Sequence, residues 1–145
     1  NLSITQSAVI EDTHRRMARS YHPAGGRWQR SFMPRTVFVF VDAQPGVSSA
    51  RRKSTARARA HHALSAYWRA LEGTLDEAKV TAATHNALIG DPEDVAQQIV
   101  ERFHPDDRLM LWFDFFADDG TQVTTAMSVF SDQVIPALRH RGVPA

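Results

Sequence analysis

The sequence contains no cysteine among its 145 residues. Disulfide bonds, a thiol nucleophile and a thiolate metal site are therefore excluded, and we expect a protein of the reducing cytoplasm. A strong charge of one sign is also absent: the net charge is +1, so no strong field draws the chain to nucleic acid or a membrane surface. No apolar run approaches the roughly 20 residues that a membrane-spanning helix needs. What remains is one globular domain, with 43% hydrophobic and 23% charged residues.

Motifs for metal and nucleotide binding are missing as well. The seven histidines show no His-Glu-x-x-His pattern or other close metal spacing. His61 and His62 are adjacent, and adjacent side chains of a helix point in different directions, so they cannot hold one ion. There is no glycine-rich phosphate loop and no Gly-x-Ser-x-Gly turn. We expect no metal site, and the spacing of residues alone names no reaction.

Two stretches carry the hydrophobic pattern of buried strands. The run 108–116 is the most apolar in the chain and bears a single acidic residue, Asp114, near its end. The run 35–42 has five consecutive apolar residues and ends at Asp42. A loop and an amphipathic helix follow each run, which is the unit of a parallel α/β fold. The sequence thus predicts an α/β domain with two β-loop-α units.

The remaining chain predicts helices. The helix at 6–22 has Ser7 as its N-cap and an inner stripe of Val9, Thr13, Met17 and Tyr21. The other expected helices are the long one at 47–72, a short one at 74–84, one that begins at Asp91-Pro92, and a last one at 120–139 that Pro136 kinks. Residues 86–89 are a brief extended or loop segment. The single domain 1–145 therefore divides into 1–84 (helix, strand, long helix), 85–139 (last βα unit) and a loose tail, 140–145.

Carboxylates gather where the predicted strands end. In parallel α/β folds the ligand meets the chain at these ends, which favours a functional role. The alternative is helix capping and turn formation, which Asp118-Asp119-Gly120 suits well. Both interpretations stay open for Asp42 and Asp114. The aromatic residues of the 108–116 run are mostly core, although one or two could face a planar ligand.

The long helix offers a third type of site, a basic surface. Its apolar stripe faces away from a basic set that could bind phosphate or nucleic acid. The set comprises Arg51, Arg52, Arg59, His62 and Arg69. The same pattern is typical of any solvated helix face, and no aromatic platform lies beside it, so nucleic-acid binding is the less favoured hypothesis.

Three segments resemble the C-terminal end of the luciferase-like monooxygenases, the flavin-dependent bacterial luciferase superfamily. They are Leu88–Ala96 (L-I-G-D-P-E-D-V-A), Leu109–Phe116 (L-M-L-W-F-D-F-F) and Met127–Arg139 (M-S-V-F-S-D-Q-V-I-P-A-L-R). They are similar to that family's penultimate helix, last barrel strand and closing helix. The preceding strand from Thr36 to Asp42 and the long helix with Tyr67-Trp68 are similar more loosely.

The resemblance implies a partial TIM barrel. Such a barrel needs about 250 residues, so the chain would be the last quarter to third of one: a segment of a longer enzyme, a subunit that pairs with another chain, or a relic. The family implies FMN or deazaflavin near the barrel mouth, with a small-molecule substrate. Position alone then suggests cofactor-binding residues, while the catalytic residues stay unknown. These candidates are Asp42, Gln44, Asp114 and Phe116 at the mouth, with Trp112 packed beside the flavin.

Two strands cannot close a barrel, so we expect an exposed sheet edge and association with another chain or with the missing barrel half. An oligomer is expected. The alternative function is a non-catalytic assembly or dimerisation module derived from that barrel.

Overall fold

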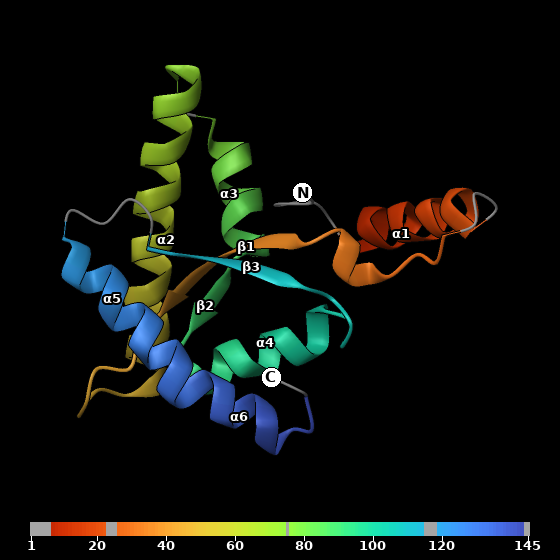
Figure 1. The fold of residues 1–145 in the computed structure, drawn as a ribbon. Coiled ribbons are helices and arrows are strands. Elements are labelled where there is room, and N and C mark those ends of the chain that lie inside the picture. Colours follow the sequence, from red (N-terminus) through yellow and green to blue (C-terminus); the bar gives the residue numbers. More distant parts are fainter. Residues whose placement is uncertain (1–6, 23–25, 75, 115–118, 144–145) are drawn as a thin grey trace.

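The computed structural model describes residues 7–22, 26–74, 76–114 and 119–143. Its centre is an open sheet of three parallel strands, β1 (Arg35–Val41), β2 (Leu88–Gly90) and β3 (Leu109–Phe113). The strand order is β2-β1-β3, with β1 in the middle (Figure 1). The predicted α/β class is therefore confirmed.

The number and the order of the strands differ from the sequence-based expectation. The additional strand, β2, overlaps the segment 86–89 that was expected to be extended or a loop and extends to Gly90, and its three residues are too few to show a period. In a barrel, strands follow one another in chain order, so β2 would lie between β1 and β3. Here β1 separates them, which is the order at the centre of a doubly wound open sheet.

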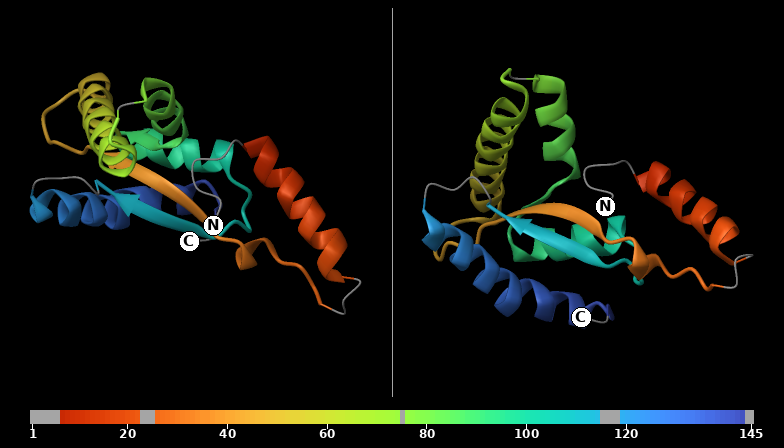
Figure 2. Two further views of the ribbon diagram at one scale, coloured as in Figure 1. Left: turned by 90° about the horizontal axis from the view of Figure 1, so that it is seen from above. Right: turned by 45° about the horizontal axis from the view of Figure 1, so that its top comes forward.

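Helices cover both faces of the sheet because the side chains of β1 alternate between two apolar cores. Val37, Val39 and Val41 pack against α4 (Pro92–Arg102) and the C-terminal helices. Phe38 and Phe40 pack against α2 (Ser49–Glu72) and α3 (Glu77–Asn86) on the other face. Figure 2 shows the layers: α2 and α3 on one side of the sheet and α5 and α6 on the other. All seven residues of β1 are buried, as predicted.

Local signals in the sequence place the helix ends. Asp91 caps α4, and its side chain and that of Asp94 bond to each other's backbone N–H groups in a capping box. Gly73 ends α2 in the left-handed conformation, at φ 70°. The apolar stripe of α2 is buried from Ala56 to Leu64, whereas Leu71 is exposed. The short helix α3 begins after its cap Asp76, slightly later than the predicted 74–84.

The C-terminal helix is interrupted where proline disturbs it. It comprises α5 (Gly120–Val129), a turn of π-helix, η3 (Phe130–Val134), and α6 (Ile135–His140). Pro136 has no N–H to donate and its ring crowds the carbonyl group four residues earlier, so a wider turn before it relieves the clash. Val143 of the expected loose tail packs against the core.

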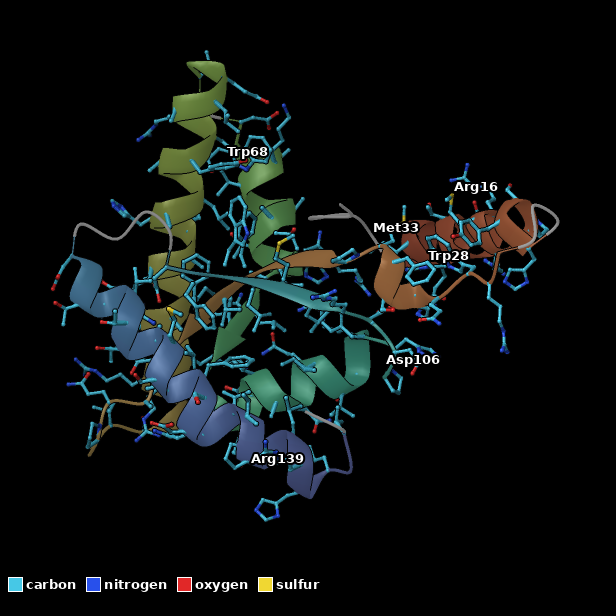
Figure 3. All side chains as sticks on the ribbon, viewed as in Figure 1. Arg16, Trp28, Met33, Trp68, Asp106 and Arg139 are labelled. Atoms are coloured by element: carbon cyan, nitrogen blue, oxygen red, sulfur yellow. The ribbon has the colours of Figure 1, made fainter. Side chains whose placement is uncertain are left out.

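The N-terminal helix α1 (Ser7–Tyr21) projects from the body of the molecule (Figure 1). Its buried residues are Ile10 and His14, and the His14 ring lies 5.8 Å from that of Trp28. Figure 3 shows Trp28 beside α1. The chain then passes through a 3-10 turn, η2 (Arg30–Phe32), into β1. In this way α1 packs mainly on the segment that leads into the sheet.

The stripe predicted for α1 is therefore wrong in part. Thr13 and Met17 are half-buried, Tyr21 is 40% exposed, and the side chain of Val9 lies outside the described residues. Periodicity located the helix, and Tyr21 of the predicted stripe contacts the rings of Trp28 and Phe32 at 6.0 and 6.2 Å. Ile10 and His14 are nevertheless the more buried positions, because the partner of α1 is the aromatic segment around Trp28 and not the main core.

Within the described residues, no helix has both the length and the apolar character to cross a membrane.

Candidate functional site

The carboxyl ends of β1 and β3 meet where the helices that follow them diverge. From β1 the chain enters α2 on one face of the sheet, and from β3 it enters α5 on the other. Such a topological switch point leaves a crevice that binds ligands in open α/β sheets. A cleft of about 610 Å³ lies there. It is lined by the loop 41–45, by Arg59 of α2 and by the polar side of α5 and η3, with Thr121, Gln122, Thr125 and Gln133.

Asp114 stands beside this cleft, at the end of β3. Its side chain is 1% exposed and its φ is 34°, the only positive φ among the described non-glycine residues. Gln122 donates from Nε2 to Oδ1 of Asp114 (3.1 Å), while Oδ2 is buried with no hydrogen-bond partner in the described chain. A left-handed backbone and an unsatisfied buried oxygen both cost free energy, and such features concentrate at functional sites.

The electrostatic environment keeps Asp114 toward its neutral form. Burial raises the pKa of its carboxyl group above the ordinary 3.8, and the charge of nearby Asp42 adds to this effect. The charge of Arg59 and the hydrogen bond from Gln122 lower the pKa but do not compensate. A carboxyl group with a raised pKa keeps its proton to a higher pH than an ordinary aspartate, and shifts of this kind are concentrated at functional sites.

Arg59 connects the cleft to the sheet. It donates from a terminal guanidinium nitrogen to the carbonyl oxygen of Val41 (2.6 Å), and its Nε lies 3.5 Å from Oδ1 of Asp114. Sequence analysis placed Arg59 on a solvated basic face. The structure corrects this: Arg59 is half-buried, and Arg52 from the same set donates to the carbonyl oxygen of Gln44 (3.0 Å). The basic set is thus divided between the cleft and the solvent.

The candidate residues from the sequence are only partly brought together. Asp42 and Gln44 line the cleft, and the Asp42 carboxylate also accepts a hydrogen bond from the Gln44 backbone (2.9 Å). Asp114 touches two residues of the lining. Trp112 does not line the cleft, since its ring lies 5.8 Å from Phe38 on the face that carries α2. Phe116 lies outside the described residues.

The other acidic residues support both interpretations made from the sequence. Asp119 lines the cleft and also caps α5, where it accepts a hydrogen bond from the backbone N–H of Thr121 (2.8 Å). Asp118 lies outside the described residues. Gln122 was not predicted as a site residue, and Arg59 was predicted only as a member of the basic set that could bind phosphate or nucleic acid. The sequence contained a weak indication that Arg59 and Gln122 belong to the site, because each is a polar residue on a helix that directly follows a predicted strand and its acidic end.

The described residues contain no group of three or more His, Cys, Asp or Glu side chains arranged to hold a metal ion. The described residues are 7–22, 26–74, 76–114 and 119–143. Comparison with known proteins found no matching family model, no matching curated protein and no matching solved structure.

Proposed function

We propose that the chain is the C-terminal part of a luciferase-like, flavin-dependent monooxygenase or related oxidoreductase, and that the cleft at the ends of β1 and β3 takes the ring of the reduced flavin. The observation that carries this proposal is Asp114, a buried carboxyl group beside a cleft at the switch point, with one oxygen that has no hydrogen-bond partner among the described residues. The resemblance of 86–139 to that family supplies the choice of flavin, as FMN or deazaflavin. The proposal includes a small-molecule substrate and the cytoplasmic location expected from the sequence.

The polar groups of the cleft suit such a ring. The pyrimidine edge of a flavin alternates hydrogen-bond donors and acceptors, and the side-chain amides of Gln44, Gln122 and Gln133 offer both. Arg59 supplies a cation for an anionic part of the ligand. When bound, the flavin would supply the redox chemistry, and the residues of this chain would orient the ring and hold a proton at Asp114.

The strand order β2-β1-β3 is that of an open sheet and not of a barrel, so the barrel fold of the family is not carried over to this chain. The features taken from the family are the cofactor and a site at the carboxyl ends of strands, both of which also suit a doubly wound sheet.

Titration with FMN, and separately with deazaflavin, tests the proposal. Because Asp114 contacts Arg59 and Gln122, which line the cleft, Asp114→Asn should weaken binding about tenfold, equivalent to about 1.4 kcal/mol. The measurement is the quenching of flavin fluorescence as protein is added. The matched control is Asp132→Asn, an exposed carboxylate on η3 outside the cleft lining, which should leave the affinity unchanged.

Absence of saturable binding to either flavin would refute the proposal, and equal affinity of wild type and Asp114→Asn would remove Asp114 from the site. Trp112→Ala belongs to the same series. Unchanged affinity is expected, because Trp112 lies outside the cleft lining; a loss would restore its position beside the flavin.

A non-catalytic assembly module is the second candidate function, and the outer edge of β3, which no described strand pairs with, favours it. The less favoured third hypothesis, nucleic-acid binding by α2, loses support because Arg52 and Arg59 bond to protein carbonyl groups. Retention on DNA that weakens steeply with salt would revive it.

A further inference from the structure

The outer edge of β2 is closed by side chains of α4. The side-chain amide of Gln98 accepts a hydrogen bond from the Ile89 N–H (3.2 Å) and donates to the Ile89 carbonyl oxygen (2.8 Å). Arg102 donates to the carbonyl oxygens of Ala87 (2.9 Å) and Asn86 (2.5 Å). Because Gln98 occupies both outward groups of Ile89, another strand cannot pair with β2 without displacing it.

The outer edge of β3 is open as far as the described residues show. Arg108 accepts from the Arg35 N–H and Asp114 donates to the Val39 carbonyl oxygen, so the even-numbered residues of this stretch direct their backbone groups toward β1. The odd-numbered residues Leu109, Leu111 and Phe113 must then direct theirs outward. In the described part of the chain β1 is the only strand that pairs with β3. The strand contains no lysine, proline or other device that blunts an edge.

One face of β3 also lacks a covering helix. Met110 and Trp112 are 42% and 40% exposed, because the helices on their face, α2 and α3, lie over β1 and β2. The Trp112 ring is held against Phe38 at 5.8 Å. An open edge beside a partly exposed apolar face is the arrangement that recruits a further strand.

We propose that β3 pairs in antiparallel fashion with β3 of a second copy of this chain, about a two-fold axis at Leu111. Each chain has one open edge and one closed edge, so association ends at two copies and does not continue into a filament. The inference concerns assembly and is independent of flavin binding.

The register follows from the backbone. In an antiparallel pair, residues that exchange both hydrogen bonds must both point outward. Centring on Leu111 pairs it with the partner's Leu111 and pairs Leu109 with the partner's Phe113, so all three outward residues of β3 are used. A shift of the centre by one residue would leave one of them unpaired.

The side chains agree with this register. Met110 faces the partner's Trp112, a favourable contact of sulfur with an aromatic ring, and Leu109 faces the partner's Phe113. A second copy of the strand is therefore complementary in hydrogen bonding and in its apolar side chains.

Sedimentation without flavin, from about 1 µM to about 1 mM protein, tests the assembly. We expect a reversible monomer–dimer equilibrium. Met110→Lys should raise the dissociation constant at least about tenfold, because lysine on an edge strand opposes pairing. The matched control is Met127→Lys: Met127 is 51% exposed on α5, away from the edge, and its substitution should leave the equilibrium unchanged. Circular dichroism melts confirm that both variants are folded.

Disulfide trapping tests the register. The chain has no native cysteine, so Leu111→Cys adds its only thiol. Two such residues at the axis would lie about 5.5 Å apart between Cα atoms, within the range that a disulfide spans. Oxidation should give a covalent dimer from Leu111→Cys and none from the control Met127→Cys.

Three results would overturn the proposal. A monomer at every concentration would show that a different strand, such as one from another protein, is needed at this edge. Growth to larger species would exclude the closed pair. A dimer that persists in Met110→Lys, or that Leu111→Cys fails to trap while dimerisation continues, would place the interface or the register elsewhere. Flavin titration is read separately, so failure of one proposal is distinguishable from failure of the other.

Discussion

Two buried aspartates flank β3, and their surroundings are opposite. Asp107 precedes the strand and Asp114 follows it, and each side chain is 1% exposed. Asp107 accepts hydrogen bonds from Arg30 (2.7 Å), Arg35 (3.1 Å) and the His104 backbone (3.1 Å). Asp114 accepts one from Gln122, lies near Arg59, and has an oxygen with no partner among the described residues.

The pKa shifts of the two carboxyl groups follow this difference. Burial acts to raise both pKa values. At Asp107 the hydrogen bonds from Arg30 and Arg35 outweigh burial, so its pKa is lowered. At Asp114 burial prevails over Arg59 and Gln122, so its pKa is raised.

The comparison separates a structural residue from a candidate functional one. Asp107 connects the start of β3 to β1 and, through Arg30 and its bond to Glu11, to α1. Each of its contacts is internal, so it has little capacity for a ligand. Asp114 has an oxygen without a partner among the described residues, a raised pKa and a strained backbone beside a cleft. A fully hydrogen-bonded aspartate would stabilise the folded protein more than Asp114 does. Such a loss of stability is typical of sites selected for function.

Neutralising each aspartate in turn should give the largest difference between the two sites, measured as the loss in the free energy of unfolding. Asp107→Asn removes the countercharge of two guanidinium groups, whose side chains are only 16% and 8% exposed, so we expect a loss of about 3 kcal/mol in the free energy of unfolding. Asp114→Asn should change it by less than about 1 kcal/mol, since Arg59 is 27% exposed and can be hydrated. Urea denaturation measures both. Equal losses would abolish the distinction.

Removing the cation beside Asp114 should have an intermediate effect. Arg59→Met loses a charged hydrogen bond to the Val41 carbonyl oxygen, so we expect about 2 kcal/mol of destabilisation. The pKa of Asp114 should rise further, because the charge that lowers it is gone. Carboxyl infrared bands followed against pH report that pKa. Arg69→Met, an exposed arginine of the same helix, is the control and should change neither quantity; a change in stability as large as that of Arg59→Met would point to helix propensity instead.

The smallest effect concerns the dependence of stability on pH. Asp107 has a folded-state pKa below 3.8, so its contribution is present above pH 3.8 and is lost as the pH falls through the lowered value. Asp114 has a folded-state pKa above 3.8, so the folded protein holds an extra proton, and stability falls as the pH rises from 3.8 through the raised value. Relative to Asp114→Asn, the wild type should therefore lose stability with rising pH; relative to Asp107→Asn it should gain. Urea denaturation from about pH 3 to about pH 7 gives the free energy of unfolding of the wild type relative to each variant. If both of these differences changed with pH in the same direction, the assigned pKa shifts would be contradicted.

The sequence predicted the elements better than their surroundings. The strand β1, the cap at Asp91 and the end of α2 at Gly73 are where local chemistry placed them, because capping and hydrophobic runs act over a few residues. The 108–116 run was expected to be a buried strand, yet β3 is an edge strand with Trp112 partly exposed. Composition cannot distinguish a central strand from an edge strand, since that depends on which strands pair.

For the candidate site, the sequence by itself determined that acidic residues follow the two strong strands at Asp42 and Asp114. Only the tertiary structure decided that Asp114 lies against Arg59 and Gln122, and that Trp112 lies on a different face from the cleft. The reason is physical. Capping and periodicity depend on neighbours along the chain, whereas burial, pKa and edge pairing depend on residues that the fold brings together from a distance.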